Sequence, residues 1–280
     1  MEAKGLRLKF VDSHIHLADE EYEGRVEEIL REAFEAGVFT LIAVSEDLES
    51  GRRSLKLAEK YPWRVLPALG VHPWPAGEIK PTDVEEVSRM IVDEASRLAA
   101  VGEVGLDWAY TRGESEVWER QKEIFRVMLK AAEKTGLPVV VHSRQSAAEA
   151  LEEVKTYRLR RVVFHWFSGP IEVLRQVLDY GCFITVGPAI YYSKHIQQIA
   201  SLTPIDALMA ETDGPVRYKG PFKGLETRPS LVPKVIEKVS EVKALKFEDA
   251  ACQILENCKK VFPLVAEAER RIFHGGPLEN

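Results

Sequence analysis

Eight short apolar runs recur along the chain, and each is bounded by polar or turn residues. Near-continuous apolar character over a few residues is typical of parallel strands that are buried on both faces. The runs are Leu8–Val11, Thr40–Val44, Val65–Leu69, Ala99–Val101, Pro138–Val141, Val162–Phe164, Cys182–Val186 and Ala207–Ala210.

Stretches with apolar positions at the helical period of 3.6 residues lie between most of these runs. Two of the stretches end on Gly37 and Gly136, and glycine is a common residue at the end of a helix. The last two stretches follow the eighth run, and we expect them to pack against the strands. The clearest stretches are 22–37, 114–136, 171–181, 229–242 and 248–262.

Strands that alternate with helices predict either a closed barrel or an open, doubly wound sheet. Polar residues of catalytic type distinguish the two folds, because they follow nearly every run. An open sheet gathers such residues at one switch point, whereas a barrel gathers them from many strand ends around one mouth. The residues are Asp12, His14, His16, Ser45, Glu46, His72, Glu103, His142, His165, Glu211 and Asp213.

The sequence therefore predicts an α/β fold, a (β/α)8 TIM barrel, with or without slight distortion, that carries extra C-terminal helices. The length of 280 residues matches a single barrel. We expect one domain over residues 1–280, with an ordered core from about residue 7 to about residue 264 and fraying of residues 275–280.

Composition and charge restrict the function classes only weakly. The chain is 45% hydrophobic and 29% charged, as in ordinary soluble globular proteins. A formal net charge of −6 argues against nucleic-acid binding by bulk electrostatics, since such domains are usually basic. It does not exclude a nucleic-acid enzyme, because bound metal ions supply local positive charge.

The cysteines and the chain's hydropathy indicate a cytoplasmic protein. Cys182, Cys252 and Cys258 are odd in number and irregularly spaced, which favours reduced thiols over disulfides. None forms a CxxC pair, so we expect buried small residues rather than zinc ligands. The first residues lack the apolar stretch of a signal peptide, and no run is long enough to span a membrane.

A His-x-His pair, His14 and His16, ends the first run. In an extended backbone, residues two apart point the same way, so both imidazoles aim at one spot. Imidazole is a common ligand for transition ions, although the pair alone is equally consistent with two ordinary polar residues. Five of the seven histidines fall at predicted strand ends, and this convergence predicts a metal site at the mouth of the barrel.

Six segments, in this order, resemble the signature segments of the TatD family of metal-dependent hydrolases, which belongs to the wider amidohydrolase-like barrels. They are DSHIHL, GVHPW, VGEVGLDWAY, PVVVHSRQS, FHWFSG and ETDGP, and they span essentially the whole chain. Trp166 stands where many relatives carry a small residue, which implies a reshaped pocket.

The resemblance implies two divalent metal ions, of zinc, manganese, cobalt or magnesium, that activate a water molecule. His14, His16 and Asp213 would hold the first ion, and Glu103 would bridge both. His142 and His165 would complete the second. Asp213 would also accept the proton of the water as a general base.

A glutamate on the fourth strand, where many binuclear relatives carry a carboxylated lysine, favours the TatD-like branch. The resemblance thus implies DNA as the partner and phosphodiester hydrolysis, typically exonucleolytic, as the reaction. The alternative reaction at the same metals is hydrolysis of a carbonyl ester or amide, such as the aminoacyl ester on a tRNA. A non-catalytic scaffold fits less well, since structural metal sites are closed by four ligands. No obligatory protein partner is evident.

Weaker indications surround these ligands. Arg144 is placed to meet a phosphate oxygen, His72 to donate to substrate, and Asp107 to support a ligand, although each is also explained by an ordinary surface or structural role. Four aromatic residues are candidates for stacking on bases, although packing over the rim explains any one of them equally well. They are Trp74, Trp108, Tyr110 and Trp166. A loose basic set follows the seventh and eighth runs, at Lys194, Arg217, Lys219, Lys223 and Arg228.

Overall fold

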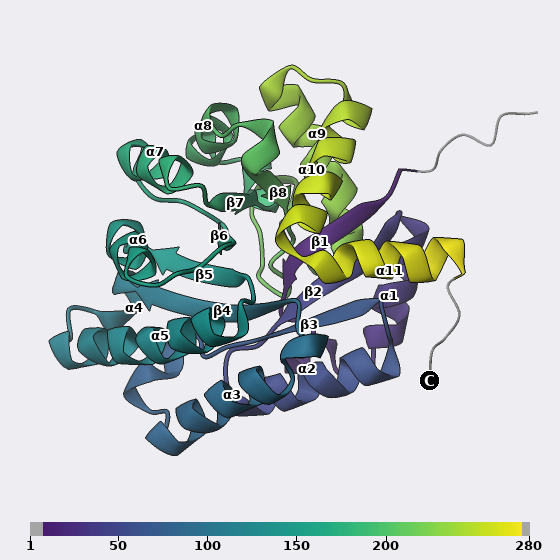
Figure 1. Ribbon diagram of the computed structural model, residues 1–280. Coiled ribbons are helices and arrows are strands. Elements are labelled where there is room, and N and C mark those ends of the chain that lie inside the picture. The colour runs from purple at the N-terminus through teal and green to yellow at the C-terminus, as the bar shows by residue number, and fades with distance from the viewer. Residues whose placement is uncertain (1–7, 276–280) are drawn as a thin grey trace, which may run out of the picture.

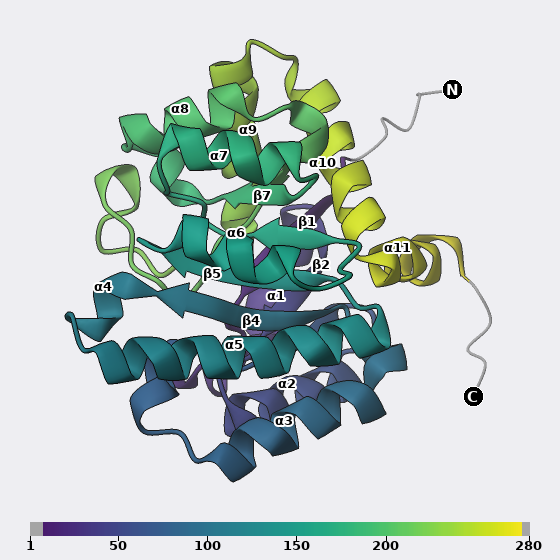
Figure 2. The same ribbon diagram turned by 60° about the vertical axis from the view of Figure 1, so that its left-hand side comes forward.

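Eight parallel strands form one sheet in the order β1 to β8, as the computed structural model shows for residues 8–275. Helices lie between the strands on the outside of the sheet (Figures 1 and 2). The TIM barrel predicted from the sequence is therefore confirmed. The strands are β1 Phe10–Ile15, β2 Val38–Val44, β3 Val65–Leu69, β4 Ala100–Asp107, β5 Val139–Arg144, β6 Val162–Phe164, β7 Phe183–Val186 and β8 Leu208–Ala210.

The barrel is nearly closed where β8 returns to β1. The hydroxyl of Ser13 donates to the carbonyl of Ala210 at 2.8 Å, and the amide of Asp213 donates to the carbonyl of His14 at 2.9 Å. The carboxylate of Asp12 accepts the amide of Thr212 at 2.9 Å. These bonds join the segment after β8 to the strand that carries the His-x-His pair.

The helices follow the predicted periodicity, and α5 ends where Gly136 takes a left-handed φ of 71° that side chains disfavour. Among residues 8–275, no helix is both long and apolar enough to cross a membrane. The helices are α1 Val26–Glu35, α2 Leu48–Lys60, α3 Pro81–Asp93, α4 Trp108–Thr111, α5 Ser115–Thr135, α6 Ala147–Lys155, α7 Ile171–Asp179, α8 Lys194–Leu202, α9 Val232–Lys243, α10 Phe247–Val261 and α11 Pro263–His274.

Strands β1, β4 and β5 extend past their predicted apolar runs, to Ile15, Asp107 and Arg144, and one helix was not predicted. Strand β4 continues past the apolar run to Asp107, so Glu103 lies inside the strand rather than after it. Apolar character breaks at Gly102 and Glu103, although the strand stays buried along its whole length. Helix α11 was not expected, and it carries the ordered structure well past residue 264. Fraying was predicted for residues 275–280, and of these only Gly275 is among the described residues.

The end of the barrel opposite the mouth is filled by the C-terminal helices. Buried side chains from inside the barrel, such as Ile42, Val140 and Met209, share one hydrophobic cluster with Phe262 and Val265. Phe262 separates α10 from α11 and is fully buried. Helix α11 lies beside the amino-terminal end of β1 in Figure 1. Hydrophobic side chains thus close this end of the barrel, opposite the end where the candidate ligands lie.

The three cysteines are free thiols, but they are not all buried. Cys182 and Cys258 are buried, whereas Cys252 is exposed on α10, contrary to the expectation for all three. Its position on the outer face of an amphipathic helix explains the difference.

We expect one thiol of the native protein to react rapidly with Ellman's reagent, and three to react after denaturation. Burial raises the pKa of Cys182 and of Cys258 to about 12, so both stay protonated and unreactive at neutral pH. The reaction is followed by absorbance, and Cys252→Ser should remove the fast phase. Two or more fast thiols in the native protein would contradict the buried positions of the other two.

Candidate metal centre

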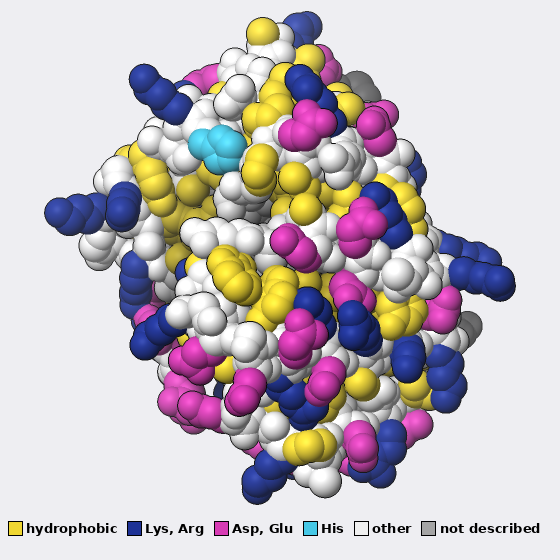
Figure 3. All heavy atoms as spheres, turned by 90° about the vertical axis from the view of Figure 1, so that its left-hand side faces the viewer, with side chains coloured by type: hydrophobic (Ala, Val, Ile, Leu, Met, Phe, Trp, Pro, Cys, Tyr) yellow, Lys and Arg dark blue, Asp and Glu magenta, His cyan; other side chains and the backbone are white. Residues whose placement is uncertain are grey.

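A cavity of about 710 Å³ opens at the mouth of the barrel. In Figure 2 the carboxyl end of β4 points to the left, toward α4, so the mouth lies on that side. Figure 3 turns this side partly toward the viewer, and hydrophobic side chains lie in a recess at the left of that view. Five of the six predicted metal ligands line the cavity, together with His72; the five are His16, Glu103, His142, His165 and Asp213.

The first group of donor atoms has the spacing of a tetrahedral ion site. The Nε2 atoms of His14 and His16 lie 3.4 Å apart. Each lies 3.2 Å from Oε2 of Glu103 and 3.3 Å from Oδ1 of Asp213. Donors bound at roughly 2.0–2.1 Å in tetrahedral geometry stand about 3.3–3.4 Å from one another. The strand thus brings the His-x-His pair together with both carboxylates, as predicted.

The other oxygen of Glu103 belongs to a second group of donor atoms. Its Oε1 lies 2.6 Å from Nδ1 of His142 and 2.7 Å from Nε2 of His165, and these two nitrogens are 3.4 Å apart. Glu103 is fully buried in the middle of β4, so its carboxylate faces both groups at once. A carboxylate shared in this way is the arrangement that a bridging ligand requires.

Several buried acceptors in these groups have no hydrogen-bond partner within residues 8–275. They include Oε2 of Glu103 and Oδ1 of Asp213. Burial raises the pKa of both carboxyls, but the surrounding histidines outweigh burial and lower these pKa values below their usual range. Buried carboxylates with unpaired oxygens need positive charge nearby. The donor set therefore fits divalent cations.

The contacts of His142 fix which of its nitrogens is available. Its Nε2 lies 3.0 Å from Oδ2 of Asp107, so this nitrogen carries the proton and donates to the carboxylate. When protonated, Nδ1 donates to Oε1 of Glu103 at 2.6 Å, and after loss of that proton it is the nitrogen that would bind an ion. A carboxylate that orients a ligating histidine in this way also raises the basicity of the imidazole. Asp107 additionally accepts the amide of Tyr110 at 3.0 Å, so it both supports a ligand and begins α4.

His72 reaches the second group but differs in its proton position. Its Nε2 lies 3.2 Å from Nδ1 of His142 and 3.3 Å from Oε1 of Glu103. The amide of Trp74 donates to its Nδ1 at 3.2 Å, so the neutral ring carries its proton on Nε2. Burial lowers the pKa of His72 to about 4, and the ring stays neutral at pH 7. His72 is thus a hydrogen-bond donor toward the centre, consistent with its predicted role.

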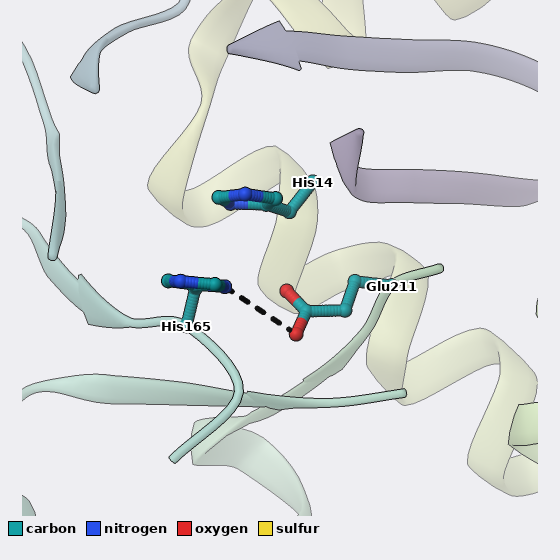
Figure 4. A group of neighbouring side chains, drawn as sticks. All are labelled: His14, His165 and Glu211. Carbon is teal, nitrogen blue, oxygen red and sulfur yellow. Dashed lines mark ion pairs between the residues drawn. The ribbon is translucent and has the colours of Figure 1, made fainter. Parts of the chain in front are cut away.

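Glu211 is a further buried carboxylate that the sequence prediction did not include among the ligands. The rings of His14 and His165 are stacked, with centroids 3.9 Å apart and an interplanar angle of 9°. Figure 4 shows Glu211 beside both rings, and its Oε1 lies 3.7 Å from Nδ1 of His165. The same oxygen accepts the amide of Trp166 at 2.9 Å. Glu211 thus lies behind the two histidines, on the side away from Glu103.

The backbone near the centre holds unusual conformations. Asp213 has a φ of 51° and Trp166 a φ of 34°, both in the left-handed region that disfavours side chains. Such residues cost roughly 1–3 kcal/mol each and persist where the surroundings determine them fully. In β4, a Cβ on Gly105 would lie 2.0 Å from the carbonyl oxygen of His142, so only glycine permits this approach of β4 to β5.

Basic residues around the mouth divide into cavity and surface groups. Arg144 and Arg217 line the cavity, whereas Arg228 is paired with Glu28, Glu32 and Glu226 away from it. The Nε of Arg144 lies 3.0 Å from Oδ2 of Asp107, and its side chain is 47% exposed. The loose basic set predicted from the sequence is therefore only partly at the site. His195 also lines the cavity. Sequence reasoning did not single it out, because it lies on helix α8 and follows no apolar run.

Comparisons with known proteins identify relatives over nearly the whole chain. A family profile described as TatD related DNase matches residues 11–263. Deoxyribonuclease TATDN3 of Homo sapiens is 30% identical over 272 residues, covering 94% of this chain and 97% of that protein. The uncharacterized metal-dependent hydrolase YabD of Bacillus subtilis is 28% identical over 255 residues, covering 90% and 98%. The crystal structure of YjjV, a TatD homologue from Escherichia coli K12, superposes with a TM-score of 0.85 at 28% identity, covering 92% of this chain and 99% of that one.

Proposed function

Because this chain belongs to the TatD-related DNase family of metal-dependent hydrolases, we propose that it is a deoxyribonuclease that hydrolyses phosphodiester bonds with two divalent ions. We further propose that it acts at the end of a strand. The spacing of the donor atoms around Glu103 carries the proposal. Two groups of donors share this one carboxylate, and we propose that each binds one ion.

The proposed ligands of the first ion are Nε2 of His14, Nε2 of His16, Oε2 of Glu103 and Oδ1 of Asp213. Those of the second ion are Oε1 of Glu103, Nδ1 of His142 and Nε2 of His165. Zinc, manganese, cobalt and magnesium all suit nitrogen and oxygen donors to different degrees, so the donor set alone leaves the metal open. Three protein ligands at the second position leave space for water or substrate.

When bound, such ions lower the pKa of a water molecule and stabilise the charge on a phosphoryl group. The protein's own residues supply proton transfer and orientation. Asp213 remains ionised at neutral pH, because its pKa is lowered, and its carboxylate can accept the proton of the attacking water. Asp107 holds His142 in the correct tautomer. His72 is placed to donate its Nε2 proton to an oxygen of the substrate.

The cavity wall favours a phosphodiester over a carbonyl substrate. Arg144 lines the cavity with a side chain that is nearly half exposed, and its guanidinium suits the oxygens of a phosphate. A volume of about 710 Å³ exceeds what a small acyl group needs and accommodates a nucleotide. Trp166, which follows β6, also lines this cavity.

The proposal is tested by comparing small substrates at saturating metal. The protein loaded with Mn²⁺ or Zn²⁺ is expected to hydrolyse bis(4-nitrophenyl) phosphate with a kcat/KM far above that for 4-nitrophenyl acetate. Asp213→Asn serves as the inactive control for both. A preference for the carboxylic ester would contradict the phosphodiesterase proposal and would direct attention to aminoacyl-tRNA.

Asp107→Ala is expected to weaken metal binding by about 10- to 100-fold, because His142 loses the carboxylate that orients it. Affinity is measured by competition with a chelator of known affinity. Asp107 also caps α4, so Asp47→Ala, which removes the cap of α2 and whose carboxylate bonds Ser50 rather than a proposed ligand, is the matched control. Equal affinities in Asp107→Ala and the control would argue against the orienting role.

Metal loading at pH 7 is expected to release protons, and affinity is expected to rise with pH. Burial lowers the pKa of His16 and of His165, but the neighbouring carboxylates outweigh burial and raise both pKa values well above the usual range. These rings therefore hold protons in the metal-free protein, and a ligand must lose its proton. Calorimetry in buffers of different ionisation enthalpy counts the protons released. Metal binding without proton release, at an affinity independent of pH, would rule out these rings as ligands.

A further inference from the structure

Two exposed aromatic rings form a shelf beside the metal centre. Trp74 and Tyr110 stack with centroids 5.7 Å apart and an interplanar angle of 19°. Trp74 is 40% exposed and Tyr110 is 43% exposed, so a large part of the stack faces solvent. Trp74 begins the turn after β3, and Tyr110 lies in α4 after β4. The shelf, defined as these two residues, is therefore built by neighbouring loops of the barrel mouth.

The shelf is continuous with the proposed metal centre. Trp74 lines the same cavity as Glu103 and His142. Its ring centroid lies 4.7 Å from that of His72 and 6.4 Å from that of His142. A group bound at the metals therefore has an aromatic surface as its immediate neighbour on this side.

The shelf is held in place by the carboxylate that orients His142. Nε1 of Trp74 donates to Oδ2 of Asp107 at 2.7 Å, and the amide of Tyr110 donates to Oδ1 at 3.0 Å. Arg144 pairs with the same carboxylate and places its guanidinium carbon 5.6 Å from the centroid of the Trp74 ring. The Trp74 ring and the backbone that carries Tyr110 are thus held before any ligand arrives, which reduces the entropy lost on binding.

Charge distinguishes this side of the cavity from the opposite side. Arg144 stands beside the shelf, and Arg112 follows Tyr110 by two residues at the end of α4. The wall formed after β1 and β2 carries Asp19, Glu21 and Glu46 instead, and Arg217, the arginine on that side of the cavity, is paired with Glu21. A chain of phosphates is attracted to the first side and repelled by the second. A DNA strand bound at the metals would therefore leave the site over the shelf.

We propose that Trp74 and Tyr110 form a base-stacking subsite for the nucleotide next to the scissile phosphate. This inference rests on the proposed function and adds a substrate feature to it. Aromatic rings stack on any base, so the subsite tolerates sequence, and it requires a base whose face is free, as in a single strand. The guanidinium of Arg144 would contact the phosphate of that nucleotide.

Tyr110→Ala tests the subsite, with Tyr110→Phe as the conservative variant. Tyr180→Ala is the matched control, because Tyr180 is 41% exposed and follows α7 at the opposite end of the barrel. Binding of a single-stranded deoxythymidine hexamer to the metal-loaded protein is followed by fluorescence anisotropy of an end label. This readout is also collected with turnover blocked by Asp213→Asn. Melting temperatures confirm that each variant is folded.

Tyr110→Ala is expected to weaken hexamer binding about tenfold, the size of one lost base stack. Tyr110→Phe and Tyr180→Ala should stay within about twofold of the unsubstituted protein. In kinetics, kcat/KM for the hexamer should fall about tenfold more than kcat/KM for bis(4-nitrophenyl) phosphate. Hexamer binding that is unaffected by Tyr110→Ala overturns the subsite, whatever the catalytic result. Failure of the unsubstituted protein to cleave either substrate overturns the proposed function instead, and Tyr110-dependent binding would still uphold the subsite.

Discussion

Glu103→Gln is expected to reduce hydrolysis by a factor on the order of 10³ or more while the barrel stays folded. The substitution keeps the size of the side chain but removes the one negative charge that faces both donor groups. An amide cannot bridge two cations, so metal content should fall from two ions per chain to one or none. Metal content by atomic emission and turnover of a phosphodiester are measured on the same sample.

A matched control separates loss of the bridge from loss of any buried glutamate charge. Glu226 is half-buried and paired with Arg25 and Arg228, away from the metal centre. Glu226→Gln should therefore retain both metals and turnover, even if its melting temperature falls slightly. Two bound ions and near-normal turnover in Glu103→Gln would disprove the bridged two-metal arrangement.

Asp213→Asn is expected to lower kcat by about 10²- to 10⁴-fold even when metal is saturating. The carboxylate of Asp213 is proposed both to ligate the first ion and to accept a proton. Asparagine keeps an oxygen that can ligate weakly, but it cannot accept the proton of water. Turnover is measured across a titration of added metal, with metal content determined at each point.

The titration distinguishes the two roles of Asp213. If activity stays low when both ions are bound, the carboxylate acts as the base. Recovery of full activity at high metal concentration would show instead that Asp213 is a ligand alone, and that another group accepts the proton.

The fold was predictable because parallel strands that are buried on both faces leave continuous apolar runs. The polar residues at the ends of those runs then favoured a barrel over an open sheet. The length of β4 was not predictable in the same way, since Gly102, Glu103 and Gly105 interrupt the apolar pattern inside a strand that is fully buried. Helix α11 was missed because its amphipathic pattern follows directly on α10, separated only by Phe262.

The convergence of the candidate ligands was also predictable, but their chemistry in detail was not. Sequence spacing brings His14 and His16 together, yet it does not say which nitrogen of a histidine faces the centre. That depends on tertiary contacts, such as Asp107 on Nε2 of His142 and the amide of Trp74 on Nδ1 of His72. Sequence reasoning likewise gave no ligand role to Glu211, whose place behind two stacked rings follows from the closure of the barrel.

The proposed activity, cleavage of DNA with two bound cations, can be measured directly. The most direct measurement uses metal-stripped protein and an end-labelled single-stranded DNA, with Mg²⁺, Mn²⁺ or Zn²⁺ added back in steps. We expect stepwise shortening of the DNA at a rate that rises until two ions are bound per chain, and no shortening with Asp213→Asn. DNA that stays intact while two ions are bound would contradict the proposed activity.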